Sequence, residues 1–265
     1  MARIAHLLLT RFNVPHPRYA RDKRGAATGT PEWLAHRFEL FERFCLPSVR
    51  GQRGAEFEWL VFFDEATPEP FRSRIEAYRA EPRFRPAFAT HFDELPERVR
   101  AAVPADAEYL ITSRLDNDDA LARDALSAVR GAFREQALEF VNLATGYILT
   151  RGVIYRARLS RNPFLSLIER RSAGPWRTVW GLAHDRAHEI GPVIDLEERP
   201  YWLQVVHERN LTNAWGDRWD HALQPWRNRV RDALTRARLL RPREGRIERT
   251  GLTLADLRGE FELGH

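Results

Sequence analysis

The 265-residue chain has a single cysteine and a single methionine, and it contains no long apolar run. Cys45 cannot form a disulfide within the chain, so we expect a buried thiol and a reducing compartment. No apolar stretch approaches the roughly 20 residues that a membrane-spanning helix needs. The apolar start, residues 4–9, is too short for a signal peptide and has no small-residue cleavage site. These shortages predict a cytosolic protein.

Lysine is also scarce, because Lys23 is the only lysine among 42 basic residues. The formal net charge of +5 could indicate nucleic-acid binding. Acidic residues are interleaved with the arginines through most of the chain, however, and the sequence has no zinc-finger spacing and no RNA-recognition motif. We therefore predict no nucleic-acid partner. A locally basic region at residues 227–246 is a candidate for contact with an anionic membrane surface.

The first half of the chain alternates apolar runs with helical patterns. The predicted strands are 2–10, 57–63, 84–90 and 108–114. The predicted helices begin at Thr30-Pro31 and Thr67-Pro68 and also cover 92–99 and 120–134. Such alternation predicts an α/β fold with a mostly parallel central sheet flanked by helices.

The pattern changes after residue 134. Short strands are predicted at 139–143, 146–150, 152–155, 177–182 and 201–206, and a short helix at 163–170. Beyond Trp219 the pattern is helical and basic. We therefore predict one domain over 1–215, with halves 1–134 and 135–215, followed by a C-terminal helical tail at 216–265.

Three carboxylates lie within four residues, at Asp116, Asp118 and Asp119. They follow a predicted strand and so lie at its carboxyl end, where open α/β sheets place ligands. Alternate residues of an extended chain point the same way, so Asp116 and Asp118 can share one side and hold a divalent cation that binds a diphosphate. The alternative is helix capping. Three adjacent carboxylates repel each other, however, unless a cation or a basic partner is present.

Several blocks of sequence, taken in order, resemble the family described as putative rhamnosyltransferases. The blocks are TRFN at 10–13, FCLPSV at 44–49, WLVFFD at 59–64, TSRLDNDDAL at 112–121 and YWLQVVH at 201–207. The acidic block is also similar to family 2 glycosyltransferases of the GT-A fold, in which a strand ends in an Asp-x-Asp-Asp sequence preceded by arginine. The resemblance covers most of residues 1–215 and implies a GT-A-like, Rossmann-like sheet.

This resemblance implies a metal-dependent glycosyltransferase. It would move a sugar, such as rhamnose, from a dTDP- or UDP-linked donor to a glycan or lipid-linked acceptor, by an inverting single displacement. Residues 1–134 would bind the nucleotide sugar and residues 135–215 the acceptor. Thr10 and Arg11 would contact the base and ribose, and Asp64 would read the base. The alternative for Asp64 is that it only opens a turn.

The same resemblance implies roles for Asp116, Asp118, His207 and Asp185, and Arg114 precedes the acidic residues in the sequence. Asp116 would bind ribose or metal, and Asp118 and His207 would complete a Mn²⁺ or Mg²⁺ site; a strand-end histidine bonded to backbone is the alternative for His207. Arg114 is expected to bind a phosphate or to hold a carboxylate. Asp185 is the candidate general base, although helix capping explains it equally well, and Glu189 and Asp195 are weaker candidates.

Two other classes of function remain open. Another metal-dependent phosphate enzyme, such as a nucleotidyltransferase or a phosphohydrolase, would use the same carboxylates and release pyrophosphate or phosphate. A non-enzymatic basic protein on nucleic acid or a membrane surface would bind in a salt-dependent way. The tail from Trp219 to Leu240 is either an amphipathic helix packed on the domain or a peripheral contact to the inner membrane face.

Overall fold

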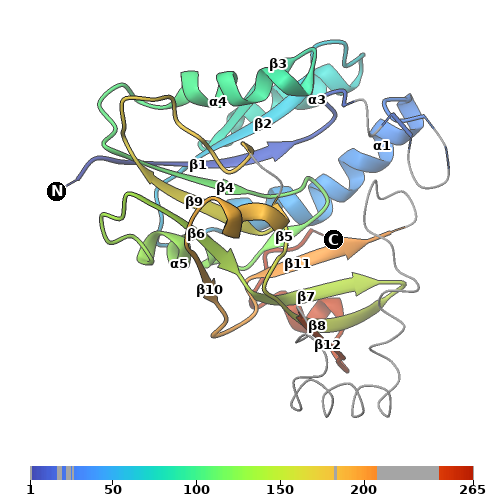
Figure 1. Ribbon diagram of the computed structural model, residues 1–265. Helices are drawn as coiled ribbons and strands as arrows, with labels where there is room; N and C mark the ends of the chain where they lie inside the picture. Colours follow the sequence, from blue (N-terminus) through green and yellow to red (C-terminus); the bar gives the residue numbers. More distant parts are fainter. Residues whose placement is uncertain are drawn as a thin grey trace.

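Two β-sheets form the framework of the protein (Figure 1). The computed structural model describes residues 2–16, 20–21, 25, 27–181, 184–207 and 245–264. Among these residues no helix is long and apolar enough to cross a membrane. The predicted basic helix from Trp219 to Leu240 lies outside the described residues.

The larger sheet has seven strands in the spatial order β10-β6-β9-β4-β1-β2-β3. In that order they comprise Val193–Leu196, Leu138–Leu143, Leu165–Arg170, Tyr109–Arg114, Ile4–Arg11, Glu58–Asp64 and Phe84–Ala89. Strand β9 runs antiparallel to β4 and β6, whereas the other neighbouring pairs are parallel. Six strands therefore end at one edge, and the predicted mostly parallel sheet is confirmed.

Helices cover both faces of this sheet. One face packs against α1, α3 and α5, which comprise Pro31–Leu40, Phe71–Ala77 and Ala125–Gly131. The other face packs against α4, Leu95–Ala102. Helix α1 begins as predicted, because the Thr30 hydroxyl accepts a 3.3 Å hydrogen bond from the Trp33 amide and Pro31 occupies the first helical position. It continues through a π-helical turn, Phe41–Cys45, into α2, Leu46–Arg50.

The smaller sheet has five strands in the order β12-β8-β7-β11-β5. They comprise Gly245–Arg249, Val153–Leu159, Thr145–Thr150, Trp202–Val206 and Ala120–Leu121. Strand β7 follows β6 after one residue, so the two sheets are directly connected. The indole of Trp202 packs where a Cβ on Gly146 would lie 2.1 Å from the ring, so glycine is required for β11 to lie against β7.

Three predicted elements differ in the structure. Residues 120–121 were expected in a helix but pair with Trp202 and Leu203, so the helix begins only at Ala125. Residues 163–170 were expected to be helical, but 165–170 form β9, because the backbone there pairs with β4 on one side and with β6 on the other. Residues 177–181 form a turn rather than a strand, with Thr178 in the left-handed region at φ 63°.

The described end of the chain is not the predicted all-helical tail. Strand β12 pairs with β8 across five residues, which extends the smaller sheet at its edge. The short helix α7, Leu254–Leu257, then places Leu257 and Phe261 in an apolar cluster with the second sheet. The chain beyond residue 244 is therefore packed on the sheet that precedes it.

A buried histidine makes the stability of this sheet depend on pH. His6 on β1 is 3% exposed, and burial followed by the charge of Arg130 lowers its pKa to about 3. An unfolded histidine has a pKa near 6.5, so below that pH the unfolded state binds the additional proton. Stability therefore falls as pH drops from about 6.5 towards 3, by up to about 1.4 kcal/mol per pH unit.

We expect His6→Gln to flatten this dependence, because glutamine does not titrate and can still reach the Ser113 hydroxyl that lies 3.0 Å from Nε2 of His6. Urea denaturation at pH 7, 6 and 5 measures the effect, with exposed His188→Gln as the control. An equal loss of stability between pH 7 and 5 in wild type and His6→Gln would contradict the assignment.

Candidate active site

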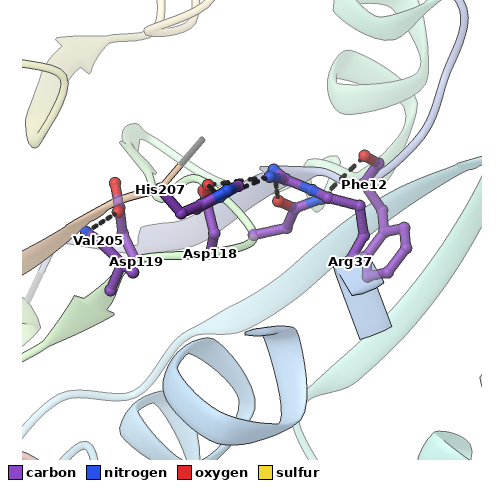
Figure 2. Close-up of polar contacts among 7 residues, drawn as sticks. Phe12, Arg37, Asp118, Asp119, Val205 and His207 are labelled. Atoms are coloured by element: carbon purple, nitrogen blue, oxygen red, sulfur yellow. Dashed lines mark hydrogen bonds and ion pairs between the residues drawn. The ribbon is translucent and has the colours of Figure 1, made fainter. Parts of the chain in front are cut away.

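The acidic loop, residues 115–119, connects the two sheets. It leaves β4 at the carboxyl edge of the larger sheet and enters β5 of the smaller one. Because β5 pairs with β11, the loop lies beside the end of β11 at Val205 and His207, and α1 approaches it from the helical layer (Figure 2). Three segments that are distant in sequence therefore meet at this loop.

Arg37 of α1 holds the centre of the acidic loop. Its Nη1 donates a 2.9 Å hydrogen bond to Oδ2 of Asp118, and its Nη2 donates to the side-chain oxygen of Asn117. The amide of Asn117 in turn donates a 2.8 Å bond to the carbonyl of Phe12, at the end of β1. The guanidinium also lies 5.5 Å from the ring centroid of Trp33. Arg37 thus connects the loop to β1 and α1.

Each of the three carboxylates has a different partner. Asp118 is 5% exposed, and its Oδ2 lies 3.0 Å from Nε2 of His207 as well as beside Arg37. Asp119 is 2% exposed and accepts a 2.8 Å bond from the amide of Val205. Asp116 is half-exposed and lies 3.4 Å from Nη2 of Arg114. The loop is therefore not a cluster of three converging carboxylates.

The two buried carboxyls have opposite pKa shifts. Burial raises the pKa of Asp118, but the charge of Arg37 and the hydrogen bond from His207 outweigh it and hold the pKa below its usual range. Burial, together with the charges of Asp118 and Asp116, raises the pKa of Asp119 well above its usual range. The pKa of Asp118 is therefore set mainly by its two basic neighbours, and that of Asp119 by burial and by the other carboxylates.

The site includes part of the predicted metal set. Asp118 and His207 face each other, and carboxylate oxygen and imidazole nitrogen are both ligands that Mn²⁺ accepts. Asp116 does not join them. Among the residues that the structure describes, no group of three or more His, Cys, Asp or Glu side chains is placed to hold an ion. Nη1 of Arg37 lies 2.9 Å from Oδ2 of Asp118 and 3.3 Å from Nε2 of His207, so a cation held by these two atoms would have to replace that guanidinium contact.

A cavity of about 440 Å³ opens at the carboxyl ends of β1, β2 and β3, and its lining residue Phe12 accepts the hydrogen bond from Asn117 of the acidic loop. Two of the predicted nucleotide-binding residues, Arg11 and Asp64, line it. Thr10 does not. Its side chain is fully buried and its hydroxyl accepts a 2.9 Å bond from Nε1 of Trp59, so the side chain of Thr10 is turned away from the cavity. Neighbouring strand residues point to opposite faces, and only Arg11 of this pair reaches the cavity.

The cavity wall is held by hydrogen bonds and aromatic contacts. Asn13 accepts a bond from the Asp64 amide and donates one to the Thr67 hydroxyl, each of 3.0 Å. Oδ1 of Asp64 accepts a 2.9 Å bond from the Ala66 amide, so Asp64 also orders the turn that the alternative interpretation proposed. The guanidinium of Arg11 lies 5.6 Å from the ring centroid of Phe92, another lining residue.

Asp185, the candidate base, lies in the 3₁₀-helical segment His184–Glu189, and its side chain is outside what the structure describes. Sequence reasoning missed Arg37 and Phe92. A signal for Arg37 was present, because it lies one turn after the buried Trp33 of α1 and one turn before the buried Phe41 of the π-helical turn. A charged residue on an apolar helix face requires a buried partner.

Comparisons with known proteins match the chain to one family. The model of the family described as "Putative rhamnosyl transferase" matches residues 2–218. No curated protein matches the sequence.

Solved structures are similar at low sequence identity. Residues 1–349 of TarS from S. aureus align at 12% identity with a TM-score of 0.42, over 76% of this chain and 60% of that one. The same TarS fragment in complex with UDP aligns at 11% identity and a TM-score of 0.42, over 77% and 60%. A putative nucleotide-diphospho-sugar transferase from Desulfovibrio desulfuricans G20 aligns at 10% identity and a TM-score of 0.41, over 89% and 98%.

The partners of Arg37 predict that its loss is costly. Arg37→Met leaves Asp118 buried without its main counter-charge, so we expect unfolding stability to fall by about 3–5 kcal/mol. The matched control is Arg74→Met, since Arg74 pairs with Glu42 but both side chains are more than one-third exposed. That change should cost about 0.2–1 kcal/mol. Urea denaturation compares the two variants, and equal losses would refute the central role of Arg37.

Proposed function

Because this chain belongs to the family described as putative rhamnosyl transferases, we propose that it moves a sugar, rhamnose in the first instance, from a nucleotide-diphosphate donor to an acceptor hydroxyl. The family assignment makes the protein a glycosyltransferase. The observation that supports the donor most directly is the cavity lined by Arg11 and Asp64, which opens at the same sheet edge as the acidic loop. Ligands of open α/β sheets bind at this edge.

The cavity suits a nucleotide in size and in chemistry. Its volume of about 440 Å³ falls within the range of small-molecule sites. Trp33 and Phe92 offer aromatic surface to a base, and Asp64 offers a hydrogen-bond acceptor to a base N–H. Arg11 offers a positive charge to a phosphate. The dTDP or UDP moiety of the donor would therefore occupy this cavity, with its diphosphate directed toward the acidic loop.

The transfer reaction places negative charge on the leaving diphosphate. The acceptor oxygen forms a bond to the anomeric carbon as the bond from that carbon to the phosphate oxygen breaks. Arg114, near the loop, would stabilise the charge that develops on the diphosphate. A divalent cation, Mn²⁺ or Mg²⁺, held by Asp118 and His207 would supply further charge neutralisation when bound. That cation would replace the 2.9 Å contact of Arg37 with Asp118.

The proposal also includes inversion at the anomeric carbon and a general base for the acceptor hydroxyl. An inverting single displacement needs a group that takes the proton of the acceptor hydroxyl. Asp185 stays the candidate, since it lies in the half of the chain assigned to the acceptor. A glycan or lipid-linked acceptor and a peripheral membrane contact through the basic tail likewise remain predictions. Release of a nucleoside diphosphate, rather than pyrophosphate or phosphate, distinguishes this function from the other phosphate enzymes.

Nucleotide binding in the cavity is tested at Asp64. Asp64→Ala should weaken the binding of dTDP or UDP by about 1.5–3 kcal/mol, the contribution of a hydrogen bond to a charged group. Isothermal titration calorimetry measures the affinity. Glu65→Ala is the control, because Glu65 is the exposed neighbour of Asp64 and does not line the cavity. Wild-type affinity in Asp64→Ala would reject its role as a base-reading residue.

The proposed metal ligands are tested by comparing two variants, Asp118→Asn and Asp116→Asn. Mn²⁺ should increase the affinity of the wild type for the nucleotide diphosphate, and Asp118→Asn should remove that increase. Asp116→Asn should keep most of it, because Asp116 lies with Arg114 and away from His207. Titration calorimetry with and without Mn²⁺ measures both. If Asp118→Asn keeps the Mn²⁺ effect, or if Asp116→Asn alone loses it, the assignment to Asp118 and His207 fails.

A further inference from the structure

A second cavity lies at the same edge of the larger sheet, on the other side of the acidic loop. Its volume is about 250 Å³, and it opens between β6, β10 and the segment that precedes β9. Its lining residues are Asn142, Ser160, Arg161, Leu165, Ala187, His188, Val193 and Asp195. Neither the nucleotide cavity nor the acidic loop shares a residue with it.

One of the lining residues, Asn142, carries a buried oxygen that has no hydrogen-bond partner among the residues the structure describes. Asn142 is fully buried, and its Nδ2 donates both to Oδ1 of Asp195 at 2.7 Å and to the carbonyl of Leu159 at 3.1 Å. Because Nδ2 donates to two acceptors, the nitrogen and the oxygen of the Asn142 side-chain amide cannot exchange places. Oδ1 of Asn142 is consequently left, among the described residues, without a hydrogen-bond partner. A buried acceptor in this state is unfavourable unless a donor reaches it.

The chemistry of the lining selects the kind of ligand. Oδ1 of Asn142 and the carboxylate of Asp195 are acceptors, so the ligand must bring O–H or N–H donors and a simple anion is disfavoured. Ser160 and Arg161 add polar groups to the lining. Leu165 and Val193 add apolar surface. A sugar ring combines hydroxyls that donate and accept with apolar C–H faces, and the volume is sufficient for one ring.

The position of the cavity relates it to the transfer reaction. The pairing register aligns Ser113 of β4 with Ser166 of β9, and Asn142 of β6 with Leu165 of β9 and Asp195 of β10. Asn142 and Asp195 are therefore level with the end of β4, about 10 Å and about 15 Å across the sheet at the usual strand spacing. The nucleotide cavity lies over β1 to β3, on the opposite side of the acidic loop.

We propose that this second cavity binds one sugar ring of the acceptor, about one to two rings away from the hydroxyl that reacts. The inference rests on the proposed glycosyltransferase function, because only then do a donor and an acceptor meet at the acidic loop. It assigns Asn142 and Asp195 as acceptor-binding residues that recognise hydroxyl groups. An acceptor of more than one sugar follows from the separation between the cavity and the loop.

The test is saturation-transfer difference NMR on the full chain, with methyl glycosides of rhamnose, mannose, glucose and galactose as probes. At least one glycoside should show transfer in the wild type. Asp195→Ala should weaken its binding about tenfold, the effect of losing one hydrogen bond to a charged group. Glu197→Ala should leave binding unchanged, because Glu197 carries the same charge two residues away, is exposed and does not line the cavity.

A second variant and a parallel measurement of nucleotide affinity distinguish failure of the acceptor cavity from failure of the donor proposal. Asn142→Ala removes the buried oxygen and should also weaken the glycoside, with its melting temperature showing whether it folds. Nucleotide affinity, measured on the same samples, should not change in Asp195→Ala. Nucleotide binding with no glycoside transfer would overturn the acceptor cavity, which then holds only water, and leave the donor proposal standing. Glycoside binding that both variants weaken supports the cavity even if no nucleotide binds.

Discussion

The buried ion pair of Arg37 and Asp118 is the interaction on which the arrangement of the site depends. Asp118 lies in a loop that connects two sheets, and a carboxylate in such a buried position is strongly unfavourable without a counter-charge. Arg37 supplies that charge from α1 and also holds Asn117, which is bonded to the end of β1. Since Val205 holds Asp119 in the same loop, one set of polar contacts joins both sheets to the first helix.

Two cavities lie on either side of the acidic loop, at the carboxyl edge of the larger sheet. The acidic loop follows β4, which is the central strand of the seven, so there is room for a ligand over β1 to β3 on one side and over β6 and β10 on the other. A reaction between two substrates needs such a geometry, because both must approach the same point without overlapping. Strand β9, inserted antiparallel between β4 and β6, sets the separation of the second cavity from the loop.

Local patterns in the sequence were sufficient for most of the larger sheet. The strands at 4–11, 58–64, 84–89 and 109–114 each contain apolar runs bounded by polar or turn residues, and the Thr30-Pro31 start of α1 is a strong capping signal. The same local patterns predicted helix at 165–170 and at 120–121, where the structure has strands. A short apolar run can be a buried strand or a buried helix, and only the neighbours that pair with it decide between them. The two-residue strand β5 exists because β11, some 80 residues later, is available to pair.

The sequence by itself determined the fold class, the place of the acidic loop at a strand end, and the position of Arg11 and Asp64 at the ends of neighbouring strands. These features follow from residues that are close in the chain. The tertiary structure alone decided which carboxylate is paired with which group, because Arg37 lies 81 residues and His207 lies 89 residues from Asp118. It also decided that Thr10 is buried and that Asn142 meets Asp195, since a side chain's face and its long-range neighbours depend on how strands pair and pack.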